Sequence, residues 1–162
     1  MIAIILAGGR GKRLRPITDY IPKPLVPLNN IPIIEWQIKH LKKFGIKEII
    51  ICTGYKSKMI ENFLAVKNNL GIKIKFLVEK TPLGTGGAIK QAGLSITDKS
   101  FFVLNGDIIT NIDLNRLAKK QNSIASIELK TKFGIINTID DKVIEFKEKK
   151  EIEIFIVEYE IH

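Results

Sequence analysis

Short runs of apolar, strand-forming residues alternate with stretches of helical periodicity over the first 120 residues of the chain. The runs are Ile2–Leu6, Glu48–Thr53, Lys73–Val78 and Phe101–Leu104. The first is apolar throughout, which is typical of a strand buried on both faces of a parallel sheet. Because an expected helix separates each run from the next, the pattern predicts an α/β fold: a doubly wound, mainly parallel sheet flanked by helices.

Four segments are expected to be helices: Pro32–Phe44, Lys58–Asn69, Thr85–Leu94 and Asn111–Gln121. In the first, the apolar side chains Ile34, Ile38 and Leu41 fall on one face. Gly45 and Gly71 stand just beyond the first two segments, where glycine commonly ends a helix. Asp113 is of the residue type that caps a helix N-terminus.

From Ser123 onward only strands are expected, and the carboxyl-terminal part is therefore β-rich. They are Ile124–Leu129, Gly134–Thr138, Val143–Phe146 and Ile152–Tyr159, with a tight turn at Asp140-Asp141. No linker is apparent, so we expect a single domain over residues 1–162, with an α/β part (1–120) and a β-rich part (121–162). An exposed apolar edge strand invites pairing with another chain. Ile152–Tyr159 is therefore the expected contact of a homodimer.

The formal net charge of +9 fits either a nucleic-acid partner or a small anionic substrate on a lysine-rich surface. The lysines are scattered and do not alternate with aromatic residues, which disfavours nucleic acid. No apolar run approaches the roughly 18 residues of a membrane helix, and no basic segment of a signal peptide precedes the apolar start. Cys52 is the one cysteine and lies in an apolar run, so we expect it to be buried. Together these features predict a cytoplasmic protein without membrane or nucleic-acid partners.

A glycine-rich, basic segment directly follows the first expected strand: Leu6-Ala-Gly-Gly-Arg-Gly-Lys-Arg-Leu-Arg-Pro16. Glycines let successive backbone N–H groups form a concave nest for phosphate, and Arg13 and Arg15 add forked donors. The segment lacks the pattern of a P-loop, and Leu14 replaces the third glycine of a dinucleotide fingerprint. Taken alone, it is also compatible with a plain glycine turn carrying surface arginines.

Two further residues stand in unusual surroundings. Lys23 lies between Pro22 and Pro24, which fix the backbone on both sides of it. Asp107 follows the strand Phe101–Leu104 at its carboxyl end, where open α/β sheets bind their ligands. Its alternative interpretation is a turn aspartate after Asn105-Gly106.

Five motifs in order make the chain resemble the sugar-1-phosphate nucleotidyltransferases. These are the Leu6–Pro16 segment, Pro22-Lys-Pro-Leu25, Pro82-Leu-Gly-Thr-Gly-Gly-Ala-Ile89, Leu104-Asn-Gly-Asp107, and Phe133-Gly-Ile-Ile136 with Val143-Ile-Glu-Phe-Lys-Glu-Lys149. The resemblance covers about residues 2–149. It implies a Rossmann-like, GT-A-like fold, and a reaction in which a sugar 1-phosphate attacks the α-phosphorus of a nucleoside triphosphate and releases pyrophosphate.

The resemblance also assigns roles to residues. Arg13 would stabilise the triphosphate and pyrophosphate, and Lys23 the α-phosphate; these two are the expected catalytic residues. Asp107 would bind Mg²⁺, which suits a hard carboxylate ligand. The nucleotide-binding set would be Leu6, Ala7, Gly8, Gly9, Gly11, Arg13, Pro82, Gly84 and Thr85. The sugar phosphate would meet Gly87, Asn105 and Lys149.

The base, the sugar and the completeness of the site are less constrained. Pro82 stands where uridylyltransferases of the amino-sugar type tend to carry glutamine, and the resemblance favours GTP and mannose 1-phosphate. Thymidylyl and glucose-directed relatives with similar loops remain the alternatives. Lys150 replaces the proline expected after Lys149, and Ile152–Tyr159 matches none of the family's later sugar and metal contacts. We therefore expect an intact nucleotide half and an incomplete sugar half. A non-catalytic module that binds a nucleotide or a nucleotide sugar remains the alternative.

Overall fold

The computed structural model describes residues 1–98, 100–120, 122–130, 135–140, 142–147, 151–154 and 159–161. The chain forms two compact units. The first comprises residues 1–123 together with 158–162, and the second comprises residues 124–157. The expected site residues fall in the first unit, except Lys149.

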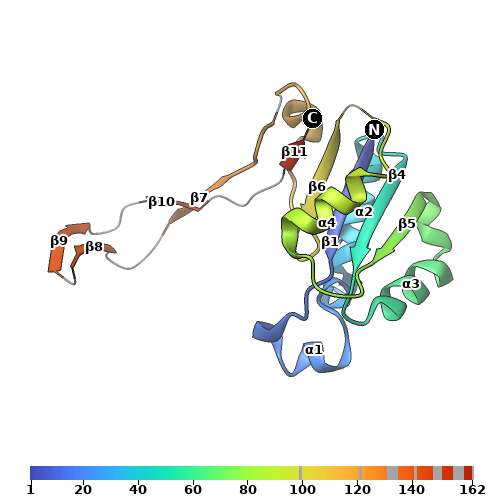
Figure 1. Ribbon diagram of the computed structural model, residues 1–162, viewed down its shortest axis with the longest axis horizontal. Coiled ribbons are helices and arrows are strands. Elements are labelled where there is room, and N and C mark those ends of the chain that lie inside the picture. Colours follow the sequence, from blue (N-terminus) through green and yellow to red (C-terminus); the bar gives the residue numbers. More distant parts are fainter. Residues whose placement is uncertain are drawn as a thin grey trace. The chain divides into compact units, whose positions relative to one another are not determined.

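A five-stranded sheet forms the centre of the first unit (Figure 1). Its order is β11-β6-β1-β4-β5. Four of its strands, β1 (Ile2–Ala7), β4 (Glu48–Thr53), β5 (Lys73–Val78) and β6 (Phe101–Asn105), run parallel. The short β11 (Tyr159–Ile161) pairs antiparallel with β6 at one edge. The mainly parallel α/β sheet predicted from the sequence is thus confirmed.

Helices cover both faces of this sheet, and the alternation within β1 decides which residues meet which helices. Ala3, Ile5 and Ala7 face the larger core with α2 (Ile33–Lys43) and α3 (Ser57–Val66). Ile4 belongs to the smaller core with α4 (Gly84–Gly93), which lies in front of the sheet in Figure 1. Each fully buried Ile or Leu contributes about 1.5–3 kcal/mol of transfer free energy. These two cores therefore hold the strands in place.

The strand order places a topological switch beside β1. The chain proceeds from β1 through β4 to β5 on one side, then crosses to β6 on the other side. At such a point the loops after neighbouring strands diverge and leave a crevice at the carboxyl edge. The loops after β1 and β6 carry the glycine-rich segment and Asp107.

Short elements connect these strands and helices. They are η1 (Lys12–Leu14), α1 (Ile17–Tyr20), η2 (Lys23–Leu25), β2 (Pro27–Leu28), β3 (Ile31–Pro32), η3 (Asn68–Gly71) and α5 (Leu114–Leu117). The predicted helix Asn111–Gln121 was too long: α5 begins only after Asp113, which caps it by accepting hydrogen bonds from the amides of Asn115 and Arg116, and it ends at Leu117. No helix among the described residues has the length and apolar content needed to cross a bilayer.

The second unit consists of paired short strands. β7 (Ile127–Lys130) pairs antiparallel with β10 (Glu151–Ile154), and β8 (Ile135–Ile139) with β9 (Lys142–Lys147). Asp140 has a φ of 48° at the turn between β8 and β9, where the sequence predicted a turn. The single strand expected over Ile152–Tyr159 is wrong: the described parts of that segment belong to β10 and β11, which lie in different sheets.

Candidate functional site

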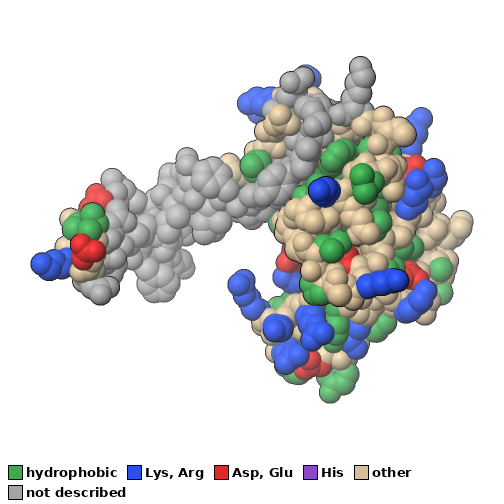
Figure 2. Space-filling view, viewed as in Figure 1, with side chains coloured by type: hydrophobic (Ala, Val, Ile, Leu, Met, Phe, Trp, Pro, Cys, Tyr) green, Lys and Arg blue, Asp and Glu red, His purple; other side chains and the backbone are tan. Residues whose placement is uncertain are grey.

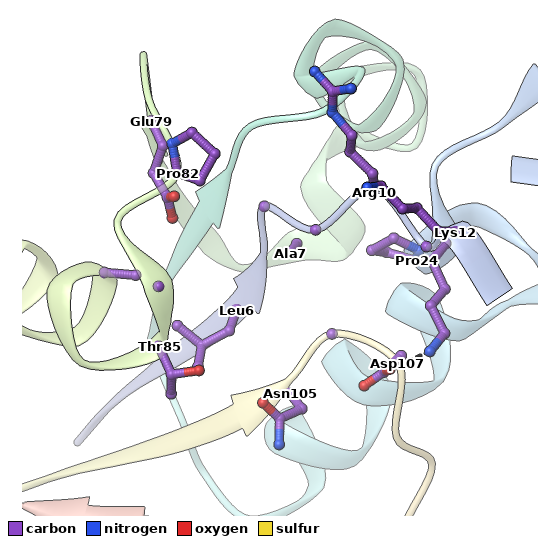
Figure 3. A pocket seen from close by; sticks show the side chains of 17 residues that line it. Leu6, Ala7, Arg10, Lys12, Pro24, Glu79, Pro82, Thr85, Asn105 and Asp107 are labelled. Atoms are coloured by element: carbon purple, nitrogen blue, oxygen red, sulfur yellow. Dashed lines mark hydrogen bonds and ion pairs between the residues drawn. The ribbon is translucent and has the colours of Figure 1, made fainter. Parts of the chain in front are cut away.

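A cavity of about 580 Å³ opens at the carboxyl ends of β1 and β6, at the topological switch. Figure 3 shows Glu79, Pro82 and Thr85 toward one end and Asp107 toward the other. Residues from four segments that are distant in the sequence line it. They are Leu6, Ala7, Gly8, Gly9, Arg10, Gly11, Lys12, Lys23, Pro24, Glu79, Pro82, Gly84, Thr85, Ala88, Asn105, Gly106 and Asp107.

The loop after β1 is held in shape by Thr18. Gly11 adopts a left-handed conformation with φ of 62°, and a Cβ there would meet Cγ2 of Thr18 at 2.9 Å. The buried Thr18 hydroxyl donates to the Gly11 carbonyl at 2.9 Å. A positive φ favours glycine, and the close methyl group adds a steric reason. The glycine at position 11 is therefore required by the fold of the loop itself.

Lys23 and Asp107 meet at the cavity although 84 positions separate them. The Lys23 ammonium donates to Oδ2 of Asp107, and both side chains are about a third exposed. Lys23 opens η2, directly after Pro22. The sequence pointed to Lys23 because of its flanking prolines and to Asp107 because it follows a strand. In the structure these two residues form an ion pair.

Asp107 lies in a tight turn after β6. The Ile108 amide donates to the Asn105 carbonyl at 3.2 Å, and the Gly106 amide donates to the Leu6 carbonyl at 2.8 Å. A Cβ on Gly106 would stand 2.6 Å from that Leu6 oxygen, so no larger residue fits this contact between β1 and the turn. The turn is thereby anchored to β1, the central strand of the switch.

Glu79 occupies the other end of the cavity. Its amide donates to the Thr53 carbonyl at 2.7 Å, and its Oε2 accepts from the Leu83 amide at 3.1 Å. The carboxylate is thus fixed beside the start of α4, where Gly84 has φ of 69°. A Cβ on Gly8 would come within 3.1 Å of Oε1 of Glu79, so the carboxylate also lies against the glycine loop.

Cys52 lies on β4 and is fully buried, as expected, with its Sγ 3.8 Å from the carbonyl oxygen of Ala88, a residue that lines the cavity. Burial, together with the negative charge of Glu79, raises the pKa of its thiol to about 12. A thiol that stays protonated is not a nucleophile. Its role is packing in the smaller core.

Most of the predicted site residues line the cavity, whereas Arg13 and Gly87 do not. Arg13 is exposed on η1 and is not part of the lining. Gly87 lies within α4, where a Cβ would meet Cβ of Leu83 at 2.9 Å, so local packing accounts for that glycine. Lys149 lies outside the described residues.

Several lining residues were not predicted: Arg10, Lys12, Pro24, Glu79, Ala88 and Gly106. Arg10 and Lys12 belong to the glycine-rich segment but occupy its variable positions. Glu79 directly follows β5 at its carboxyl end. Its position after a parallel strand is the same sequence signal as that of Asp107 and could have identified Glu79 as well.

Charge around the cavity is mixed, with Arg10, Lys12 and Lys23 against Glu79 and Asp107. Basic side chains occur on several parts of the visible surface of the first unit, with a group near the segment that carries α1 (Figure 2). Among the described residues, no group of three or more His, Cys, Asp or Glu side chains is arranged to hold a metal ion. The part of the chain that the structure describes therefore offers a metal few protein ligands at this cavity.

Comparison with known proteins identifies relatives over nearly the whole chain. The family model described as "Nucleotidyl transferase" matches residues 2–153. The D-glycero-alpha-D-manno-heptose 1-phosphate guanylyltransferase of Campylobacter jejuni is 44% identical over 155 residues, covering 92% of this chain and 69% of the relative. The mannose-1-phosphate guanyltransferase of Yarrowia lipolytica is 41% identical over 147 residues, covering 84% of this chain and 40% of the relative.

A solved structure has the same fold. HddC from Yersinia pseudotuberculosis, complexed with GMP-PN, superposes with a TM-score of 0.78 at 29% identity. The match covers 99% of this chain and 76% of the other.

Proposed function

Because the chain belongs to the nucleotidyl transferase family, we propose that it transfers a guanylyl group from GTP to the 1-phosphate of a manno-configured sugar. The products would be a GDP-sugar and pyrophosphate. The observation that carries this proposal is the cavity itself, which joins the glycine loop, Lys23 and Asp107 at the topological switch. The guanylyltransferase names of the relatives, and GMP-PN in the related structure, support the choice of GTP.

The glycine loop is suited to the triphosphate. Gly9 lines the cavity, and a Cβ added to it would meet no protein atom within 4 Å. The protein therefore leaves this space open, and a phosphate group that approaches the backbone closely would use it. Lys12 and Lys23 line the same cavity and supply positive charge. Arg13 would join them only by extending from the neighbouring η1.

Asp107 suits the Mg²⁺ that nucleotidyl transfer commonly needs. Mg²⁺ keeps several waters and binds through one or two carboxylates together with substrate phosphates. The single Asp107 carboxylate at the cavity fits that pattern, with Asn105 beside it as a neutral oxygen donor. When bound, the ion would neutralise phosphate charge as pyrophosphate leaves. Because Lys23 already pairs with Asp107, the metal would share this carboxylate with the ammonium group.

Glu79 offers a physical reason for guanine. The Watson–Crick edge of guanine presents two adjacent N–H donors, and a carboxylate accepts from both. Uracil and thymine present one N–H between two carbonyl oxygens, which a carboxylate repels. Glu79 lies with Pro82, Gly84 and Thr85 at the end of the cavity away from Asp107, and we propose that this end binds the base and ribose. We therefore propose Glu79 as the residue that reads the base.

In nucleotidyl transfer the protein mainly aligns the reactants and neutralises their charge, and it need not form a covalent bond to the substrate. An oxygen of the sugar 1-phosphate would attack the α-phosphorus in line with the departing pyrophosphate. Lys23 would hold the α-phosphate, and the basic residues of the glycine loop would hold the leaving group. Asn105, Gly87 and Lys149 remain the proposed contacts of the sugar phosphate.

A substrate panel tests this proposal. Purified protein is mixed with GTP, ITP, ATP, UTP or dTTP, each with Mg²⁺ and one of three sugar 1-phosphates: manno-heptose, mannose or glucose. Pyrophosphate release is the readout. We expect GTP to exceed all others and the manno-configured sugars to exceed glucose, with the heptose first because of the Campylobacter relative. Nucleotide binding without turnover for any pair would refute the enzyme and favour a non-catalytic binding module.

The oligomeric state and the location complete the proposal. β11 is the outermost strand of its sheet, and an edge strand can pair with the same strand of a second copy. We therefore retain the homodimer through the carboxyl-terminal strand, now at Tyr159–Ile161. A monomeric mass by light scattering at high concentration would contradict it.

A cytoplasmic location follows from the need for GTP and is tested by cell fractionation.

A further inference from the structure

The turn that carries Asp107 is held by a side chain from a distant helix. Gln37 lies on α2 and is only 3% exposed. Its Nε2 donates to the Asn105 carbonyl at 2.7 Å and to the Ile108 carbonyl at 2.8 Å. A primary amide has two N–H donors, and here both are directed to this one turn.

These two carbonyls lie on either side of Asp107. Asn105 and Ile108 are the first and last residues of the turn, and the Ile108 amide also donates to the Asn105 carbonyl. With Gly106 bound to Leu6 on β1, the backbone next to Asp107 is fixed from the sheet and from α2. Removing the Gln37 donor would take this partner from the Ile108 carbonyl and leave the Asn105 carbonyl with the Ile108 amide. The turn would then be free to relax.

The same helix also holds the segment that follows Lys23. Nε1 of Trp36 donates to the Leu28 carbonyl at 3.2 Å, and the Ile33 amide donates to the Val26 carbonyl at 3.1 Å. Trp36 and Gln37 are neighbours in the sequence. One turn of α2 therefore connects the two backbone segments whose side chains, Lys23 and Asp107, meet at the cavity.

We propose that Gln37 is a positioning residue for the reaction: it fixes the place of the Asp107 carboxylate relative to Lys23 and thereby sets the affinity of the site for a divalent metal. Gln37 does not line the cavity and would not touch the substrate. The kinetic and metal parts of this inference rest on the proposed function. Partners that orient a metal ligand typically change metal affinity or activity by about 10- to 100-fold when they are removed.

The test compares Gln37→Met with a control on the same helix. Methionine keeps the length and flexibility of the side chain but has no N–H donor. The control, Lys67→Met, removes the 2.6 Å contact of Lys67 Nζ with Glu35, which lies on α2 two residues before Gln37. It loosens the attachment of α2 without touching Asn105 or Ile108. A purely structural role of Gln37 would give both variants the same defects at equal loss of stability.

Three measurements are made on each folded variant. These are the dissociation constant of Mn²⁺ in the presence of GTP, by electron paramagnetic resonance; kcat and KM for GTP; and hydrogen exchange of the amides at 105–108. For Gln37→Met we expect Mn²⁺ binding weakened about 10- to 100-fold, a similar fall in kcat with KM for GTP changed little, and faster exchange at the turn. Lys67→Met should leave all three near wild type.

Unchanged exchange and Mn²⁺ affinity in Gln37→Met, or equal losses in Lys67→Met, would overturn the inference. If Gln37→Met does not fold, Gln37→Leu removes both N–H donors with an apolar side chain of similar size, and the same losses are expected. A wild-type protein that neither turns over nor binds Mn²⁺ would refute the proposed function alone. Exchange at residues 105–108 would then still decide whether Gln37 holds the turn.

Discussion

Lys23 Nζ donates a hydrogen bond to Oδ2 of Asp107, across 84 positions of the sequence. Both residues lie at the carboxyl edge of the sheet, one on η2 and one after β6. The pair keeps a positive and a negative group adjacent at the position where a phosphate and its counter-ion would bind. A bound metal ion and phosphate would add a positive group beside Asp107 and a negative group beside Lys23, so that each side chain gains a second partner of opposite charge.

Removing the Asp107 charge should abolish most of the activity. In Asp107→Asn we expect kcat for pyrophosphate release to fall by about 10²–10³-fold, the usual effect of losing one electrostatic contact in a transition state. Stability should change by less than about 1 kcal/mol, because the ion pair is partly exposed. Lys58→Met, which breaks the exposed Lys58–Glu61 pair on α3, is the matched control. A wild-type kcat in Asp107→Asn would refute the metal role.

Arg13 and Arg15 provide a second comparison within one loop. The resemblance assigns Arg13 to the triphosphate, although Arg13 does not line the cavity. Nε of Arg15 contacts Oδ1 of Asp19 at 3.1 Å. If Arg13 extends toward bound GTP, Arg13→Ala should lower kcat/KM for GTP at least about 100-fold, and Arg15→Ala should not. Equal, small effects of the two variants on kcat/KM would indicate that Lys12 or Arg10, and not Arg13, binds the triphosphate.

Gly9 should matter for the ligand and not for the fold. A methyl group at position 9 meets no protein atom within 4 Å, so Gly9→Ala should leave the melting temperature unchanged or slightly raised. The same methyl would occupy the space proposed for phosphate, and GTP affinity should fall at least about tenfold, or 1.4 kcal/mol. Gly93→Ala is the control, since position 93 is equally open and lies at the far end of α4. Unchanged GTP binding in Gly9→Ala would show that phosphate does not approach this glycine.

The four parallel strands were predictable because each is marked by the apolar pattern of its own residues. Ile2–Leu6 is apolar on both faces, and the observed β4 and β5 have the predicted bounds. The helix predicted over Pro32–Phe44 is observed at Ile33–Lys43, since its apolar stripe and Gly45 are also local signals. The element Ile152–Tyr159 was mispredicted, because alternation within a segment does not reveal which sheet each part joins.

The composition of the site was only partly predictable. Motif positions identified Lys23 and Asp107, but their contact depends on β6 lying beside β1, which no local pattern specifies. Glu79 was not predicted, because its place at the cavity depends on β5 ending at the same edge of the sheet as β1 and β6. Gln37 gave no signal in the sequence, because a glutamine on a helix gains its role only when a turn packs against it.

Cys52 gives a simple measure of the integrity of the smaller core. Its thiol is buried and its pKa is raised to about 12, so almost none is thiolate at pH 8 and alkylation should be slow. Iodoacetamide labelling, followed by mass spectrometry, should modify the native protein far more slowly than the protein in denaturant. Since Cys52 is the one cysteine of the chain, the labelling site is unambiguous. Rapid stoichiometric labelling of the native protein would contradict the packing of β4 against α4.

The acid stability of the protein should depend on Glu35, which connects α2 to α3. Its carboxylate contacts the ammonium groups of Lys67 at 2.6 Å and Lys39 at 2.9 Å, and these hydrogen bonds, that with Lys67 first, lower its pKa from 4.5. A pKa lowered by folding means that the charged form stabilises the folded state above about pH 4.5. This contribution is lost as the pH falls through the folded-state pKa.

Glu35→Gln should therefore be less stable than wild type at pH 7, by about 1 kcal/mol because both lysines are half exposed. The difference should shrink below pH 4.5, where the wild-type carboxylate becomes protonated. Urea unfolding at pH 7, 5, 4 and 3 measures it. Glu48 is a second carboxylate whose pKa is lowered by lysines, here Lys73 and Lys75, so Glu48→Gln serves as the comparison. A difference between wild type and Glu35→Gln that stayed constant from pH 7 to pH 3 would show that the glutamine acts through packing and not through the lost charge.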